Sequence, residues 1–214
     1  MTLTLYTAPT GNGFKPTILL NFLNIPFTLH LFPWPTPEIK QEWYLKINPN
    51  GRIPSIVDDG IRLNESNAIL LYLADKYDKE GKVSYKVNDG DNYWKQIQWL
   101  FFQSTQFTNA FQQLFIYRTS NVTDEQVLGK AFANSDNVYS VLEGQLKKGK
   151  FIVGDKFTIV DISFVSVHYR MVKTLEGTIY EIKDFAEKYS RCQEWYCTCY
   201  SFKEVREAFE KVAN

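Results

Sequence analysis

The hydrophobic pattern of the first 32 residues changes twice, and this limits the folds that the chain can adopt. Residues 2–6 (TLTLY) and 27–32 (FTLHLF) alternate in the way that is typical of strands. Between them, four apolar residues recur at helical spacing: Phe14, Ile18, Phe22 and Ile25. A strand, a helix and a strand of this length predict a β-α-β unit. Pro16 is expected in the first turn of that helix, where its missing N–H costs least.

The next segments predict the rest of an α/β region. Residues 41–47 form a short predicted helix, and two short strands flank an Asp59-Gly60 turn, which is the strongest two-residue hairpin signal. Residues 65–78 then place apolar side chains on one face of a helix. The predicted order is β-α-β-α-β-β-α around one mixed sheet, in a domain of residues 1–78.

A polar, glycine-containing stretch at residues 79–91 predicts a linker, and residues 92–214 predict an all-helical domain. Thr158 and Asp161 have the spacing of a capping box, which fixes the start of a buried helix. The predicted helices are residues 93–117, 123–149, 157–172, 180–200 and 201–213. The fold class is therefore α/β plus all-α.

Composition excludes several classes of protein. The 24 basic and 24 acidic residues balance, which argues against a nucleic-acid binder. No apolar stretch is long enough for a membrane span, and no signal peptide is evident, so we expect a cytoplasmic protein without membrane or nucleic-acid partners. No metal is expected, because the cysteines lie far from both histidines and resemble buried free thiols: Cys192, Cys197 and Cys199.

Three short segments are candidates for ligand binding. Residues 10–13 (TGNG) join the first strand to its helix, where Thr10 and Asn12 could donate hydrogen bonds to an anion, and a thiolate there would have a lowered pKa. The alternative for this segment is a glycine-rich turn in which Asn12 caps the helix.

The second segment contains Ile53 and Pro54. A cis peptide bond there would expose the Ile53 backbone to an extended peptide ligand, whereas an ordinary trans bond at a loop end is the alternative. In the third segment, Glu65 and Ser66 begin a helix. The helix end suits a carboxylate and Glu65 an ammonium, so the pair matches both charges of an amino acid. The alternative is a helix cap with an acid in the first turn.

The order of these segments, NPNGRIPSIVDDG followed by LNESNAILLYLADKY, resembles the cytosolic glutathione transferases over essentially the whole chain. APTGNGFK and IQWLFFQ are similar to the nu class and to fungal relatives of the yeast nitrogen-regulatory prion protein. The resemblance implies a thioredoxin-like N-terminal domain, a helical-bundle C-terminal domain and a homodimer.

The resemblance also implies roles for individual residues. Thr10 and Asn12 would donate hydrogen bonds to the glutathione thiolate, and Gly11 stands near the position of the catalytic serine in other classes. Pro54 would be the cis-proline and Ile53 would pair with the cysteinyl unit. Glu65 and Ser66 would bind the γ-glutamyl end.

The chain departs from the family pattern at the residue expected to bind the glycine carboxylate, since Ile39 occupies that position. Arg52 is the best remaining candidate, followed by Lys40, and Lys130 matches a basic residue of nu-class relatives. The aromatic residues between 94 and 115 are expected to be mostly core or subunit interface, with one or two lining an apolar site.

These observations predict a glutathione transferase that uses glutathione as substrate and attacks an apolar electrophile or a disulfide, so disulfide reduction is included. The alternative is a non-catalytic binding or regulatory module of the same fold. The sequence does not identify the second substrate.

Overall fold

The computed structural model describes residues 3–213. The predicted strand start at Thr2 and the predicted domain ends at residues 1 and 214 lie outside the described residues. The first part of the chain forms a four-stranded mixed sheet in the order β2-β1-β3-β4, in which β1 and β2 are parallel and the other pairs are antiparallel. Its elements are β1 (Leu3–Thr7), α1 (Gly11–Phe22), β2 (Thr28–Leu31), the 3-10 helix η1 (Glu38–Lys40), α2 (Glu42–Leu45), β3 (Ser55–Asp58), β4 (Ile61–Asn64) and α3 (Ser66–Tyr77). The predicted element order is confirmed.

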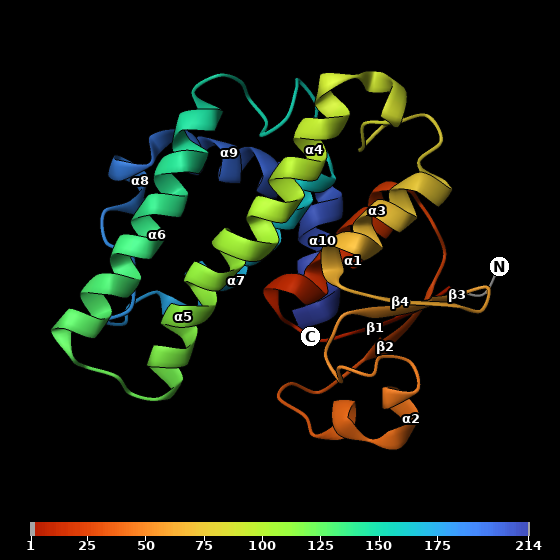
Figure 1. Ribbon diagram of the computed structural model, residues 1–214, viewed down its shortest axis with the longest axis horizontal. Coiled ribbons are helices and arrows are strands. Elements are labelled where there is room, and N and C mark those ends of the chain that lie inside the picture. The colour runs from red at the N-terminus through yellow and green to blue at the C-terminus, as the bar shows by residue number, and fades with distance from the viewer. Residues whose placement is uncertain (1–2, 214) are drawn as a thin grey trace.

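Helices cover both faces of the sheet. α1 and α3 lie on one side and α2 on the other (Figure 1). Leu3 and Leu5 of β1 are buried in the main core, whereas Tyr44 of α2 packs on the opposite side against Phe32. The hairpin between β3 and β4 turns at Asp59 and Gly60, which both have positive φ (48° and 90°), as the sequence predicted.

The start of α1 differs from the prediction. Thr10 caps the helix by accepting a hydrogen bond from the Gly13 N–H at 3.0 Å, so α1 begins at Gly11. Pro16 therefore lies inside the helix rather than in its first turn. A proline N–H is absent there, so the Asn12 carbonyl lacks its normal helical partner four residues later.

The second part of the chain is helical. The predicted helix at 93–117 contains a π-helical segment, η3 (Gln103–Phe107), and the predicted helix at 180–200 is divided at Tyr189. The elements are the 3-10 helix η2 (Val87–Asp89), α4 (Asp91–Phe102), α5 (Thr108–Thr119), α6 (Glu125–Leu146), α7 (Ile159–Leu175), α8 (Phe185–Lys188), α9 (Ser190–Ser201) and α10 (Lys203–Ala213). The fold is thus a thioredoxin-like sheet domain followed by a helical domain.

Helix α7 lies at the centre of the helical part and also packs against α1. The predicted capping box is confirmed, because Asp161 accepts a hydrogen bond from the Thr158 N–H at 2.9 Å. Asp161 also accepts one from the Trp195 indole at 2.9 Å, and burial raises its pKa to about 6. One hydrophobic core runs through both parts of the molecule.

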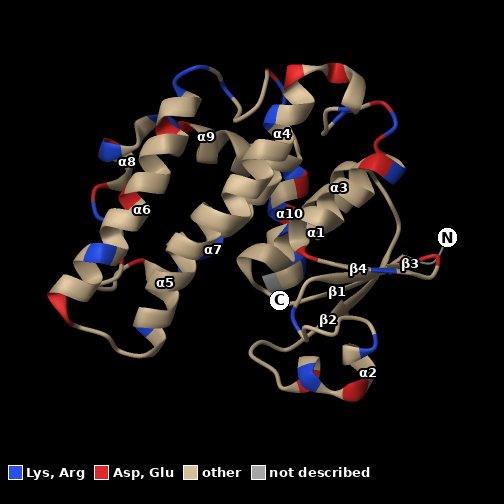
Figure 2. Ribbon diagram, in the orientation of Figure 1, with Lys and Arg blue, Asp and Glu red and all other residues tan. Residues whose placement is uncertain are grey.

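Charged residues are sparse along the run from α4 to α5, which carries only Asp91, Lys95 and Arg118 (Figure 2). The residues described by the structure include no helix that is long and apolar enough to cross a membrane.

Candidate functional site

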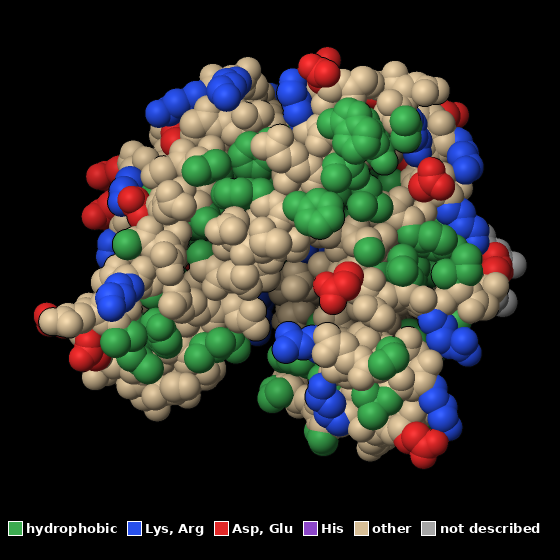
Figure 3. Space-filling model, in the orientation of Figure 1, with side chains coloured by type: hydrophobic (Ala, Val, Ile, Leu, Met, Phe, Trp, Pro, Cys, Tyr) green, Lys and Arg blue, Asp and Glu red, His purple; other side chains and the backbone are tan. Residues whose placement is uncertain are grey.

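A cleft of about 420 Å³ lies between the sheet domain and the helices α5 and α7. The space-filling view shows the molecule hollowed between these two parts (Figure 3). Four of the seven predicted site residues line the cleft: Thr10, Asn12, Arg52 and Ile53. A larger groove of about 620 Å³, between α5 and α6, is lined largely by amide side chains and contains none of the predicted residues.

Thr10 and Asn12 are positioned by the start of α1. The Thr10 hydroxyl accepts the capping bond from Gly13, so its own proton is still available to a ligand. The side-chain oxygen of Asn12 is buried and has no hydrogen-bond partner among residues 3–213. Thr10 rather than Asn12 is therefore the cap, and the Asn12 side chain is free of that role.

Gly11 contacts the helical domain closely. A Cβ atom at this position would lie 2.9 Å from the Val167 Cα atom, so α1 and α7 leave no room for a larger residue. A catalytic serine at position 11 is thus excluded by packing. Tyr6 lies in β1, as predicted, and its ring contacts that of Tyr44.

The loop before β3 presents Arg52 and Ile53 to the cleft. The Arg52 carbonyl accepts hydrogen bonds from the Tyr44 hydroxyl and from the Asn48 amide, both at 2.7 Å, and these bonds fix the loop. The peptide bond between Ile53 and Pro54 is cis, as the resemblance implied. Pro54 itself is buried and is not part of the cleft lining.

The residues considered for binding the glycine carboxylate differ in whether they line the cleft. Ile39 and Lys40 both line the cleft, and the Lys40 ammonium donates a hydrogen bond to the Asn50 carbonyl at 2.9 Å. Lys130 is exposed on α6 and does not line the cleft. Arg52 and Lys40 are therefore both cations of this wall of the cleft.

Glu65 and Ser66 lie where α3 begins, but neither lines the cleft. Glu65 is exposed, has a positive φ of 67° and makes no side-chain capping bond. The prediction that the two residues begin a helix is confirmed, whereas the alternative of a helix cap with an acid in the first turn is not found, because Glu65 is itself the N-cap residue and the first turn of α3 contains no acid.

Sequence reasoning missed Lys15. This α1 residue is buried, and its ammonium donates to Ser66 Oγ (3.0 Å), Asn67 Oδ1 (2.9 Å) and Gln103 Oε1 (2.9 Å). Burial lowers the pKa of Lys15 to about 7, although the nearby Glu65 charge opposes this shift. The only sequence signal was a lysine within an apolar helical stretch.

The helical wall of the cleft supplies aromatic side chains and one cation. Phe111 and Phe115 line it, as expected for one or two members of the aromatic run, while Trp99 and Phe107 are core residues. Arg170 of α7 also lines the cleft and was not predicted. Its place in the cleft depends on the packing of α7 against segments that are distant in the sequence, so no local pattern indicates it.

The cysteines are free thiols, and Cys192 and Cys199 are buried as predicted. The prediction is wrong for Cys197, which is exposed because it lies on the outer side of α9. Within residues 3–213, no group of three or more His, Cys, Asp or Glu side chains is arranged to hold a metal.

Comparisons with known proteins agree with this geometry. The glutathione S-transferase N-terminal domain family matches residues 12–76, and the C-terminal domain family matches residues 102–202. Glutathione S-transferase 2 of Schizosaccharomyces pombe is 31% identical over 225 aligned positions, covering 99% of this chain and 96% of the relative.

Two solved structures are similar over nearly the full length. A glutathione S-transferase-like protein of Lodderomyces elongisporus has a TM-score of 0.92 and 38% identity, covering 98% of this chain and 96% of its own. The glutathione transferase URE2P6 of Phanerochaete chrysosporium, in complex with oxidized glutathione, has a TM-score of 0.90 and 31% identity, covering 99% and 96%. The chain therefore belongs to the glutathione S-transferase family, in which its relatives include URE2-type fungal transferases.

Proposed function

We propose that the protein is a glutathione transferase that binds glutathione in the 420 Å³ cleft and activates its thiol. The observation that carries this proposal is that Thr10 and Asn12, at the N-terminus of α1, share one cleft with Arg52 and Ile53. Homology to named glutathione S-transferases supports it.

The chemistry follows from the helix end. A thiolate placed at the N-terminus of α1 is stabilised by the helix dipole and by hydrogen bonds from the Thr10 hydroxyl and the Asn12 amide. Lowering a thiol pKa from about 8.5 to roughly 6.5 requires about 2.7 kcal/mol of differential stabilisation. One helix end and two hydrogen bonds to a charged sulfur are of that magnitude.

The remaining predicted residues would hold the rest of the tripeptide. Arg52 would bind the glycine carboxylate, with Lys40 beside it, and the backbone of Ile53 next to Pro54 would pair with the cysteinyl unit. Glu65 and Ser66 would bind the γ-glutamyl ammonium and carboxylate. These assignments can be tested one residue at a time through the KM for glutathione.

The role of Asn12 is tested by an Asn12→Ala variant, with Asn137→Ala as the matched control, because Asn137 is exposed on α6 and lies outside the cleft. The pKa of bound glutathione is titrated by thiolate absorbance. We expect Asn12→Ala to raise this pKa toward the ordinary thiol value and the control to leave it unchanged. An identical pKa in both variants would contradict the role of Asn12.

We further propose that the thiolate attacks either an electrophilic carbon or a disulfide sulfur. In the second case, attack forms a mixed disulfide and releases a thiolate. The relative solved with oxidized glutathione makes disulfides a reasonable substrate class to assay. Retention on immobilised glutathione without turnover of either substrate type would favour the non-catalytic module instead.

We also propose that the protein forms a homodimer. Several large apolar side chains are strongly exposed: Ile61 (48%), Val87 (65%), Trp94 (65%) and Phe101 (64%). Hydrophobic side chains gather over α4 and over the neighbouring region of α3 and β4 (Figure 3). We expect Trp94→Glu to shift the protein toward monomer in sedimentation equilibrium. A mass equal to one chain in the wild type would reject the dimer.

The three-part division of the chain at residues 1–78, 79–91 and 92–214 and the cytoplasmic location remain predictions. The division is tested by limited proteolysis, for which we expect the first cuts within residues 79–91.

A further inference from the structure

The charges that line the cleft all have the same sign. Among the described residues 3–213, Lys40, Arg52 and Arg170 line it, and no aspartate or glutamate does. Lys40 and Arg52 belong to the sheet-domain wall, where the proposed function assigns them to the glycine carboxylate of glutathione. Arg170 comes from α7 on the opposite wall, and the proposed function assigns it no partner.

Arg170 is half-buried, yet the structure shows no hydrogen bond or ion pair for its guanidinium within residues 3–213. Burial lowers the pKa of Arg170, Tyr169 opposes this shift, and the nearby positive charge of Arg118 adds to it. A guanidinium that is partly removed from water without an anion partner loses hydration, and a bound anion would offset that loss. The position therefore fits a cation whose partner is a ligand.

The surroundings of Arg170 describe the rest of that ligand. Trp34, Phe111, Phe115 and Val167 line the same cleft, and Trp34 is 38% exposed. Aromatic walls with one convergent charged group bind a ligand that has an apolar body and a single opposite charge. A guanidinium suits a carboxylate in particular, because its parallel N–H groups match the two oxygens.

We propose that the second substrate is an aromatic or otherwise apolar electrophile that carries a carboxylate, and that Arg170 binds this carboxylate. The inference rests on the proposed transferase function and adds a substrate class to it. In the reaction, the glutathione sulfur forms a bond to the electrophilic carbon and a leaving group departs with its electron pair. The thiol proton passes to solvent.

The test uses a matched pair of electrophiles, para-chloro-meta-nitrobenzoate and its methyl ester, from which chloride is displaced. The values of kcat/KM are measured for the wild type, Arg170→Gln, Arg170→Lys and the control Arg62→Gln, an exposed β4 residue outside the cleft. Comparing the acid-to-ester ratio between variants cancels the difference in intrinsic reactivity between the two compounds. We expect this ratio to fall roughly ten-fold or more in Arg170→Gln, less in Arg170→Lys and not in the control.

A binding measurement keeps the inference separate from catalysis. Meta-nitrobenzoate and its methyl ester, which have no leaving group, are titrated by calorimetry into the glutathione-bound wild type and Arg170→Gln proteins. We expect the wild type to prefer the acid and the variant to lose that preference. If neither electrophile turns over but this preference is present, the proposed reaction fails and the Arg170 site stands.

The inference is overturned if the acid-to-ester ratios of turnover and of binding are the same in the wild type and in Arg170→Gln. It is also overturned if Arg170→Gln raises the KM for glutathione while leaving both ratios unchanged, since Arg170 would then serve glutathione itself. Thermal unfolding of each variant shows that it is folded before it is assayed.

Discussion

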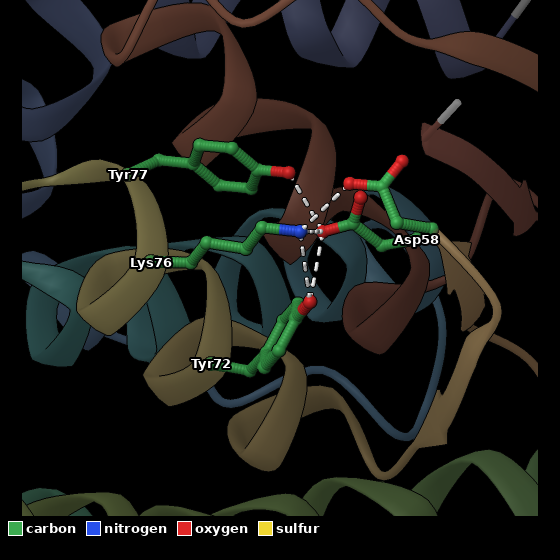
Figure 4. Close-up of polar contacts among 5 residues, drawn as sticks. Asp58, Tyr72, Lys76 and Tyr77 are labelled. Carbon is green, nitrogen blue, oxygen red and sulfur yellow. Dashed lines mark hydrogen bonds and ion pairs between the residues drawn. The ribbon is translucent and has the colours of Figure 1, made fainter. Parts of the chain in front are cut away.

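Two polar clusters that both include residues of α3 each surround a buried ionisable side chain, and they differ in how its charge is balanced. The Asp58 cluster consists of Asp58, Tyr72, Lys76 and Tyr77 (Figure 4). The Lys15 cluster consists of Lys15, Ser66, Asn67 and Gln103. In both, one charged group receives or donates three hydrogen bonds.

In the Asp58 cluster, the buried carboxylate has a cationic partner, Lys76, which also pairs with the exposed Asp59 at 3.2 Å. One carboxylate oxygen of Asp58 accepts hydrogen bonds from Tyr77 (2.7 Å), Tyr72 (2.9 Å) and the Lys76 ammonium (2.9 Å). Burial opposes ionisation of Asp58, but these bonds outweigh it and lower its pKa. The hydrogen bond to Asp58 in turn raises the pKa of Lys76. The cluster fastens the end of β3 to α3.

The Lys15 cluster leaves its charge unbalanced. All three acceptors of the Lys15 ammonium are neutral oxygens, and its pKa falls to about 7. Gln103 continues the network to Thr108 in the cleft wall (2.9 Å). Strongly shifted pKa values concentrate at functional sites. The two clusters therefore differ in one respect. The buried charge of Asp58 has an oppositely charged hydrogen-bond partner, whereas that of Lys15, beside the proposed γ-glutamyl site, has only neutral ones.

The largest effect is expected when Lys15 is replaced by methionine. The folded pKa of about 7 lies below the ordinary 10.5, so the unfolded state holds the proton more tightly and wild-type stability rises with pH between these values. The free energy of unfolding of the wild type should gain roughly 2–4 kcal/mol relative to Lys15→Met between pH 7 and pH 10. Urea unfolding across this range measures it, and a constant difference would contradict the assignment.

Asp58→Ala should have the next largest effect. It removes the acceptor of three hydrogen bonds and should lower the free energy of unfolding by roughly 2–3 kcal/mol, without changing the KM for glutathione. Asp75→Ala, at an exposed α3 residue, is the control. Because the folded pKa of Asp58 is depressed, this stability is present above about pH 4 and is lost as the pH falls further. A raised KM would place Asp58 in the site instead.

Gln103→Glu would give the Lys15 ammonium an anionic hydrogen-bond partner. A carboxylate within hydrogen-bond distance of Lys15 should raise its pKa and reduce the pH-dependent gain in stability by roughly 1–3 kcal/mol. Gln106→Glu places the same charge at an exposed residue of η3 and should leave the gain intact. Urea unfolding at pH 7 and pH 10 distinguishes the two, and equal gains would show that Lys15 does not sense position 103.

Lys76→Met should have the smallest effect on stability at neutral pH. Its side chain is 32% exposed, and Asp58 would keep both tyrosine donors. Such partly exposed ion pairs contribute little. The pKa of Asp58 should nevertheless move upward, so acid unfolding should begin at a higher pH than in the wild type. An acid titration followed by circular dichroism measures this, and an unchanged midpoint would assign the shift to the tyrosines alone.

The sequence by itself determined the local elements. The order β-α-β-α-β-β-α, the Asp59-Gly60 turn and the capping box at Thr158 were all predictable, because periodicity, turn residues and caps act over a few neighbouring residues. The grouping of Thr10, Asn12, Arg52 and Ile53 was reached through the family resemblance, since these residues are about 40 positions apart.

Only the tertiary structure determined the local geometry, burial and position of residues at which distant segments pack together. The π-helical segment η3, the burial of Lys15 and the presence of Arg170 in the cleft have no distinctive local pattern. Lys15 looks like a surface lysine until α3 and η3 pack against α1 and enclose it. Local propensities fix how the chain turns, whereas burial and desolvation depend on the whole packed molecule, and these are the forces that set the charges of the candidate site.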